Sequence, residues 1–167
     1  MSNHPLVSVC MLCYNHEEYL AQAIQSVLDQ TYHNWELVIT DNASTDGSRK
    51  IIENFARKDS RIKLCFLDFN SFPSGGINNS IKLSSGEYIA TLSGDDYFVP
   101  NKLKRQVDFM LENNLSICFT WVNVVDDSGN ELIGHWANGV FNRNFDNQID
   151  LLIKEVSFNS AKIQQIY

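Results

Sequence analysis

Residues 7–12 of the chain read VSVCML, and residues 35–40 read WELVIT. Each is a short and nearly continuous apolar run, which is the pattern of a β-strand buried on both faces. Further strands are predicted at residues 62–67, 88–92 and 117–122.

Helices are predicted between these strands because apolar residues recur there at helical spacing. They extend from Leu20 through Leu28, from residue 48 to residue 58, and onward from Pro100. Asn15 and Glu18, three positions apart, are a candidate capping pair for the first helix. Strands that alternate with helices favour right-handed crossovers. We therefore predict one α/β domain over residues 1–167, with a mainly parallel sheet flanked by helices.

The chain of 167 residues carries 20 acidic and 13 basic residues, which gives a net charge of −7. This balance argues against nucleic acid as a partner, because a phosphate backbone requires clustered Lys and Arg. A nucleotide stays compatible with it, since a metal ion can supply the positive charge. The sequence has neither a signal-peptide pattern nor an apolar run of transmembrane length. The expected location is cytoplasmic, either free or at the periphery of a membrane.

Cys10 and Cys13 form a C-x-x-C spacing, which could indicate a redox motif. Such a motif opens a helix, whereas these residues lie in and near the end of a predicted strand. We interpret them as thiols that pack like small hydrophobic side chains. The four histidines have no ligand spacing and are expected on the surface.

Polar residues follow the strand at residues 35–40, where Asp41 and Asn42 begin the run DNASTDG. In sheets of this type, ligands gather at the carboxyl ends of the strands. An acidic side chain at that point can accept hydrogen bonds from a nucleobase or a ribose. The alternative is that the segment only forms a turn and caps the next helix.

The strand at residues 88–92 is followed by SGDDY, in which Asp95 and Asp96 are adjacent carboxylates. Like charges this close repel one another unless a cation or a basic group compensates them. Carboxylate oxygens suit Mg²⁺ or Mn²⁺, which would take phosphate oxygens and water as further ligands. The alternative is a solvated turn in which Asp96 caps the following helix.

Tyr14 and Asn15 follow the first strand, so three strand ends carry aromatic or polar residues. A nucleoside diphosphate requires a ring for stacking, a carboxylate for the base or sugar, and a carboxylate for a phosphate-bound metal. The sequence thus predicts one shared binding site at the carboxyl edge of the sheet.

Several motifs resemble those of family 2 glycosyltransferases in order and spacing. They are PLVSV at residues 5–9, YNHEEYL at 14–20, SVLDQTY at 26–32, WELVITDNASTDG at 35–47, and GEYI and GDD within 86–96. The resemblance covers roughly residues 5–125. It implies the Rossmann-like GT-A fold, a nucleoside-diphosphate sugar (usually a UDP-sugar) as donor, Mn²⁺ or Mg²⁺ as cofactor, and transfer with inversion. The implied acceptor is a hydroxyl of a carbohydrate or of a lipid-linked molecule, as in polysaccharide biosynthesis.

The same resemblance implies roles for individual residues. Tyr14 would flank the base, Asp41 would bind the base edge, and Asp95 would hold the metal. The full donor-binding set that it implies is Leu12, Tyr14, Asn15, Glu17, Asp41, Asn42, Asn78, Gly94 and Asp96.

The sequence departs from the family pattern at three positions, and the first is Leu12, which stands where a Pro or a Thr is usual. Ser93 stands where the first Asp of the Asp-x-Asp motif usually lies, and Ile77 replaces an Arg that contacts the donor phosphates in many relatives. The general base of the family, an Asp, is not found here, and we expect it beyond Tyr167. Residues 150–156 have a helix-like pattern. We expect the chain to be the donor-binding part of a longer enzyme; the alternative is a non-catalytic module that binds nucleotide sugars.

Overall fold

The structure, a computed structural model, describes residues 4–120, 123, 125–126, 129–130 and 163–166. The chain divides into two compact units, Met1–Arg105 and Gln106–Tyr167, and each is described by itself. All candidate site residues named above lie in the first unit.

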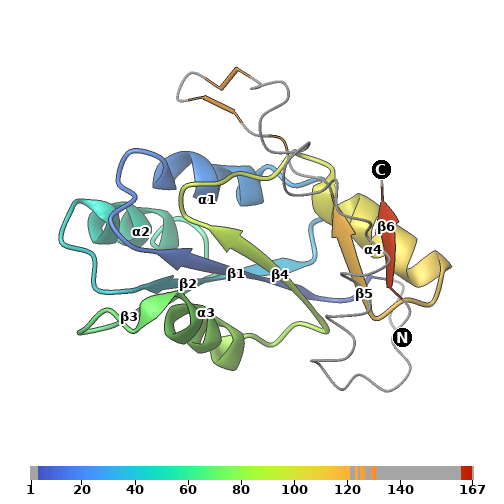
Figure 1. Cartoon of the computed structure of the whole chain (residues 1–167), viewed down its shortest axis with the longest axis horizontal. Helices are drawn as coiled ribbons and strands as arrows, with labels where there is room; N and C mark the ends of the chain where they lie inside the picture. The colour runs from blue at the N-terminus through green and yellow to red at the C-terminus, as the bar shows by residue number, and fades with distance from the viewer. Residues whose placement is uncertain (1–3, 121–122, 124, 127–128, 131–162, 167) are drawn as a thin grey trace, which may run out of the picture. The chain divides into compact units, whose positions relative to one another are not determined.

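A four-stranded parallel sheet with the strand order β3-β2-β1-β4 forms the centre of the first unit (Figure 1). Its strands are β1 (Val7–Cys13), β2 (Trp35–Asp41), β3 (Ile62–Phe66) and β4 (Tyr88–Ser93). Asp41 lies in register with Cys13 on one side and with Phe66 on the other, so these three strands end at one edge. The predicted α/β fold and its four strands over this part of the chain are confirmed.

β1 and β2 are the central and most buried strands. All seven residues of β2 are buried, and Leu12 is the one partly exposed residue of β1. The outer strands β3 and β4 contain more exposed positions. The two nearly continuous apolar runs therefore belong to the strands that have sheet neighbours on both sides and helices on both faces.

Helices cover both faces of this sheet. α1 (Leu20–Leu28) and α2 (Ser48–Ala56) lie on one face, and α3 (Phe72–Leu83) lies on the other (Figure 1). α4 (Lys102–Glu112) agrees with the helix predicted after Pro100. Among the described residues, no helix has the length and apolar character needed to cross a membrane.

The capping pair predicted for α1 is wrong. The helix begins at Leu20, its N-cap position is Tyr19, and no side chain caps it. Asn15 instead adopts a positive φ of 56°, and its Oδ1 accepts the Thr45 backbone N–H at 2.8 Å. The Asn15 side chain thus connects two loops rather than capping a helix, a contact that local sequence spacing does not reveal.

The sequence did not predict α3. Its segment contains Pro73, Gly75, Gly76 and two Asn residues, which favour turns over helices. Tertiary packing decides the outcome, because Gly76 lies so close to β1 that an added Cβ would be 2.2 Å from a methyl carbon of Leu12. The small size that weakens helix propensity is what lets the helix approach the sheet.

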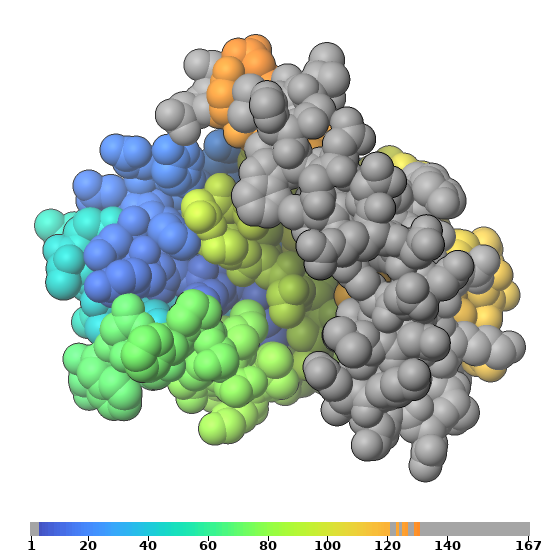
Figure 2. Space-filling view, in the orientation of Figure 1, coloured from blue at the N-terminus to red at the C-terminus, as the bar shows by residue number. Residues whose placement is uncertain are grey.

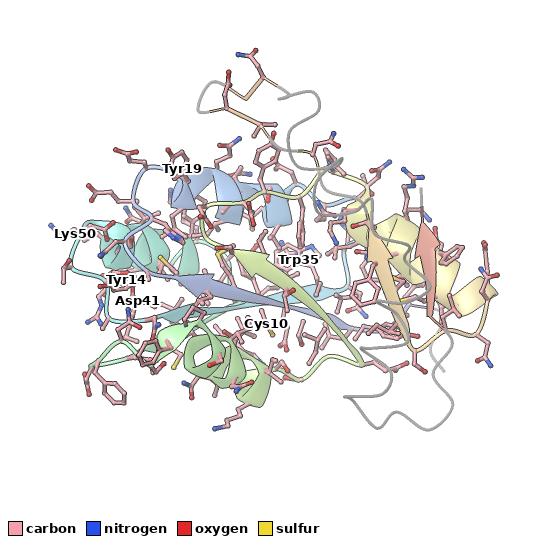
Figure 3. All side chains as sticks on the ribbon, in the orientation of Figure 1. Cys10, Tyr14, Tyr19, Trp35, Asp41 and Lys50 are labelled. Atoms are coloured by element: carbon pink, nitrogen blue, oxygen red, sulfur yellow. The ribbon has the colours of Figure 1, made fainter. Side chains whose placement is uncertain are left out.

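Cys10 and Cys13 are buried free thiols, as the sequence interpretation requires. Burial raises the pKa of Cys10 to about 11, and the negative charge of Glu36 adds to the effect. A thiol that stays protonated is a poor nucleophile. Cys10 lies along the sheet, away from the edge that carries Tyr14 and Asp41 (Figure 3).

In the second unit, β5 (Ile117–Thr120) pairs in parallel with β6 (Ile163–Ile166). The fifth predicted strand is therefore present, but in a separate two-stranded sheet. Gly129 has a φ of 80° and donates its N–H to the Asp126 carbonyl at 2.8 Å. The helix-like pattern at residues 150–156 lies outside the described residues.

Candidate functional site

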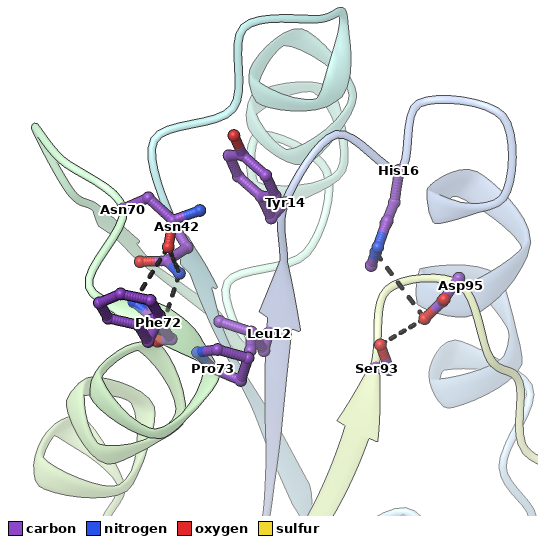
Figure 4. Close-up of a pocket in the computed structure, with 9 residues that line it drawn as sticks. All are labelled: Leu12, Tyr14, His16, Asn42, Asn70, Phe72, Pro73, Ser93 and Asp95. Carbon is purple, nitrogen blue, oxygen red and sulfur yellow. Dashed lines mark hydrogen bonds and ion pairs between the residues drawn. The ribbon is translucent and has the colours of Figure 1, made fainter.

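A cavity with a volume of about 580 Å³ lies at the carboxyl edge of the four-stranded sheet. The loop after β1, the segment that opens α3 and the end of β4 contribute to its wall (Figure 4). In the space-filling view these segments have blue, green and yellow-green surfaces on the face shown (Figure 2). The lining residues are Leu12, Tyr14, His16, Asn42, Asn70, Phe72, Pro73, Ser93 and Asp95.

The cavity has two chemically different ends (Figure 4). Tyr14 and Phe72 lie on one side of it, and we call them the aromatic end; both rings are exposed, by 42% and 76%. His16, Ser93 and Asp95 lie on the other side, and we call them the acidic end. A ligand that spans the cavity therefore meets rings at one end and a carboxylate at the other.

The acidic end is organised around Asp95. Its Oδ1 accepts a hydrogen bond from the Ser93 hydroxyl and lies 3.8 Å from Nδ1 of His16. The pKa of Asp96 is raised by desolvation of its carboxyl and by the negative charge of Asp95, which His16 partly offsets. Negative charge at this end is thus only partly compensated by protein groups.

The residues at the acidic end fit a divalent cation. The Asp95 side chain is 49% exposed, so one carboxylate is available to a ligand in the cavity. Nδ1 of His16 is buried and has no hydrogen-bond partner among the described residues. Carboxylate oxygens are ligands that suit Mn²⁺ and Mg²⁺, whereas imidazole suits other transition metals better. The described residues contain no group of three or more His, Cys, Asp or Glu residues that could hold the ion, so phosphate oxygens and water would complete its coordination.

Asn42 lines the cavity, but its amide group is used within the protein. Its Oδ1 accepts both the backbone N–H and the hydroxyl of Ser71 at 2.9 Å. Its Nδ2 donates to Asn70 Oδ1 at 2.9 Å and to the Phe72 carbonyl at 3.4 Å. The side chain thereby fixes the segment that carries Phe72, while its predicted direct contact with the donor stays a prediction.

Asp41 does not line the cavity but lies buried at the end of β2, near Tyr14 (Figure 3). Its Oδ1 accepts hydrogen bonds from Arg49 Nε at 2.7 Å and from the Ser44 backbone N–H at 3.1 Å. Its Oδ2 is buried and has no hydrogen-bond partner among the described residues. The predicted role of Asp41 in binding a base stays a prediction.

Asn15 and Glu17 join the loop after β1 to the loop after β2. Glu17 Oε2 accepts the Gly47 backbone N–H at 2.5 Å, and the Glu17 backbone N–H donates to Asp46 Oδ2 at 3.0 Å. Both residues line a second, smaller cavity of about 220 Å³, which shares His16 and Asp95 with the first. Their side chains thus line the second cavity rather than the large one, and their contact with the donor stays a prediction.

The remaining predicted residues are Asn78, Gly94 and Asp96, and none of them lines the large cavity. Gly94 donates its N–H to the Leu12 carbonyl at 2.8 Å, and an added Cβ would be 2.8 Å from His16 Nδ1. Its lack of a side chain therefore makes room for the histidine. Asn78 is exposed on α3.

Sequence reasoning missed four lining residues, which are His16, Asn70, Phe72 and Pro73. His16 was expected on the surface, yet its side chain is 23% exposed and faces Asp95. The other three lie in a segment that reads as a turn, and the available signal was an aromatic residue between polar residues and a proline.

Comparisons with known proteins show the family of this chain. The family model of glycosyl transferase family 2 matches residues 8–164. An uncharacterized glycosyltransferase of Haemophilus influenzae is 41% identical over 130 residues, which are 78% of this chain and 52% of that protein. The Escherichia coli protein WfgD, named as a UDP-Glc:alpha-D-GlcNAc-diphosphoundecaprenol beta-1,3-glucosyltransferase, is 39% identical over 79% of this chain and 51% of its own length.

Among solved structures, residues 1–349 of Staphylococcus aureus TarS in complex with UDP superpose with a TM-score of 0.68 and 27% identity. The match covers 72% of this chain and 36% of that one. The fold is therefore of the GT-A type, and the chain spans about half the length of the two curated relatives named above. The chain belongs to glycosyl transferase family 2.

Proposed function

We propose that the large cavity binds a nucleoside-diphosphate sugar, with UDP as the nucleotide, and that the sugar is transferred to an acceptor hydroxyl with inversion and with the help of Mn²⁺ or Mg²⁺. The observation that carries the proposal is the arrangement of Tyr14 and Asp95 at opposite ends of one cavity (Figure 4). A flat base suits the rings, and a metal-bound diphosphate suits the carboxylate.

The protein groups at the acidic end have distinct tasks in this proposal. Asp95, with His16 beside it, would hold the metal, and the hydrogen bond from Ser93 orients the Asp95 carboxylate. When bound, the metal offsets negative charge on the leaving diphosphate. Because the Ser93 hydroxyl adds no negative charge, the site rests on one carboxylate where the family usually has two. The base that deprotonates the acceptor is not assigned to any residue in the described part of the chain.

The donor and acceptor classes rest on the relatives. TarS was solved with UDP and also with UDP-GlcNAc, and WfgD is named for a UDP-Glc donor and a diphosphoundecaprenol-linked acceptor. On this basis we propose a UDP-sugar donor and a carbohydrate or lipid-linked acceptor, as in the assembly of a surface polysaccharide.

The test is titration calorimetry of the full chain with UDP, in the presence and absence of MnCl2. We expect Mn²⁺ to strengthen UDP binding in the wild-type protein. Asp95→Ala should remove that gain in affinity. We expect the gain to be at least about tenfold, because one charge-assisted contact of about 1.4 kcal/mol corresponds to a tenfold change in the dissociation constant. Asp29→Ala is the matched control, because Asp29 is an exposed carboxylate that follows α1 and lies outside both cavities.

If the wild-type protein and Asp95→Ala each bind UDP equally strongly with and without Mn²⁺, the metal has no part in the proposed function. A transfer assay on a longer chain that includes residues after Tyr167 separates the enzyme from a non-catalytic binding module. Ser93 and Ile77 are the residues that favour such a module, and it would become the preferred function if the longer chain bound UDP but neither transferred nor hydrolysed the sugar.

A further inference from the structure

Phe72 combines two features that are each unfavourable in isolation. The residue is 76% exposed although its side chain is apolar, and its backbone has a positive φ of 59°. Positive φ is rare for residues with a side chain, and the residue before a proline normally takes an extended conformation. Local sequence preferences therefore do not explain the conformation of Phe72.

Polar contacts, two of them made by the buried Asn42, hold this conformation in place. Asn42 is 2% exposed and donates to the Phe72 carbonyl at 3.4 Å, and the Phe72 backbone N–H donates to Asn70 Oδ1 at 2.9 Å. Asn42 also donates to that same oxygen of Asn70 at 2.9 Å. A residue held in an uncommon conformation by its surroundings is a candidate for a functional role.

The direction in which Phe72 is presented suggests the role. Phe72 and Tyr14 lie on the same side of the cavity, away from His16 and Asp95 (Figure 4). A diphosphate with its metal belongs at Asp95 because of charge, so the nucleoside occupies the side with the two rings. Aromatic rings bind bases through stacking, which tolerates any base because every base has a π face.

We propose that Phe72 forms a second aromatic wall of the base site, opposite or beside Tyr14, and that Asn42 and Asn70 act as positioning residues for its ring. The inference rests on the proposed nucleotide-binding function. It assigns part of the affinity for the nucleoside to a residue whose conformation lowers the stability of the free protein.

The decisive variant is Phe72→Gly, measured in the full chain. Removal of the ring should weaken UDP binding on the order of tenfold, as expected for one lost base–aromatic contact. Binding of inorganic pyrophosphate with Mn²⁺ should be unchanged, because pyrophosphate has no base. The melting temperature should stay equal or rise, since Gly adopts positive φ without steric cost.

Two further variants complete the test. Phe69→Gly removes an equally exposed ring, 72% exposed, from the same loop but outside the cavity, and should leave UDP affinity unchanged. Phe72→Trp keeps an aromatic wall and should keep UDP affinity within about twofold of wild type.

The outcomes separate this inference from the function on which it rests. If wild-type protein binds UDP and Phe72→Gly binds it equally well, the aromatic wall is wrong and the proposed function stands. A parallel loss of UDP and pyrophosphate binding in Phe72→Gly would also overturn the inference, because it would indicate a general distortion of the site. If the wild-type protein binds neither UDP nor any other nucleoside diphosphate, both proposals fail.

Discussion

Asp41 is a charged residue that the fold buries completely, and its ion pair with Arg49 compensates the charge. Arg49 Nη2 also donates to the Leu67 carbonyl at 2.6 Å, and its guanidinium lies 5.3 Å from the centre of the Phe66 ring. The arginine therefore connects the end of β2 to the end of β3, next to the candidate site.

Arg49→Met should leave a buried and unpaired carboxylate. Losing one partner of a buried pair costs about 3–5 kcal/mol, and we expect about 2–3 kcal/mol here because Arg49 is 39% exposed. The double variant Asp41→Asn/Arg49→Met should be more stable than Arg49→Met alone, since the uncompensated charge is then absent. Urea unfolding measures both differences.

The control for the Arg49 variants is Arg57→Met. The guanidinium of Arg57 bonds the Asn54 side chain on the exposed surface of α2, so its removal should change the free energy of unfolding by less than about 0.5 kcal/mol. Equal stability of the Arg49 and Arg57 variants would show that the ion pair at Asp41 does not support the fold.

At the scale of elements, Glu36 connects the beginnings of neighbouring strands. Its carboxylate accepts hydrogen bonds from Ser8 of β1 at 2.6 Å, from the Ser85 backbone N–H at 2.5 Å and from Lys63 of β3 at 2.7 Å. Burial alone would raise the pKa of Glu36, but these hydrogen bonds and the Lys63 charge lower it below its ordinary value of 4.5.

This depressed pKa predicts how stability changes with pH. A carboxyl group whose pKa is lower in the folded protein contributes stability above its unfolded value, and the contribution is lost as pH falls through the folded value. Glu36→Gln should therefore be less stable than wild type at pH 7, by about 1–3 kcal/mol for the charged hydrogen bonds. The difference should shrink as the pH is lowered below 4.5.

Thermal unfolding of wild type and Glu36→Gln between pH 7 and pH 3 measures this effect. Glu53→Gln serves as the control because Glu53 is exposed on α2 and should show little difference from wild type at any pH. A Glu36→Gln deficit that stays constant over the whole range would contradict the assignment of the effect to the carboxylate charge.

The two central strands could be predicted from sequence because burial on both faces requires a nearly continuous apolar run. α3 could not, because a local pattern of Gly, Pro and Asn is the pattern of a turn. Its helical state depends on contacts that are distant in sequence, such as the hydrogen bond between the hydroxyls of Ser80 and Thr40 at 2.8 Å. Phe72 was missed for the same reason, since it opens this helix.

At the scale of the whole molecule, the large cavity belongs entirely to the unit Met1–Arg105. Tyr14 and Asp95 could be predicted from sequence because both follow strands of one parallel sheet, whose carboxyl ends share an edge. The partners of Asp41 and Asn42 could not, since a hydrogen bond to Arg49 or to residues 70–72 depends on how the loops fold back on that edge.

Binding at this edge should be visible by hydrogen exchange over the whole chain. If UDP and Mn²⁺ occupy the large cavity, the amides of residues 12–16, 70–72 and 93–96 should exchange more slowly, because these segments contribute to its wall. Residues 57–61 precede β3 at the opposite edge of the sheet and should be unchanged. Mass spectrometry of peptides with and without both ligands measures the difference. Protection at residues 57–61 without protection at 70–72 and 93–96 would place the nucleotide elsewhere and contradict the proposed site.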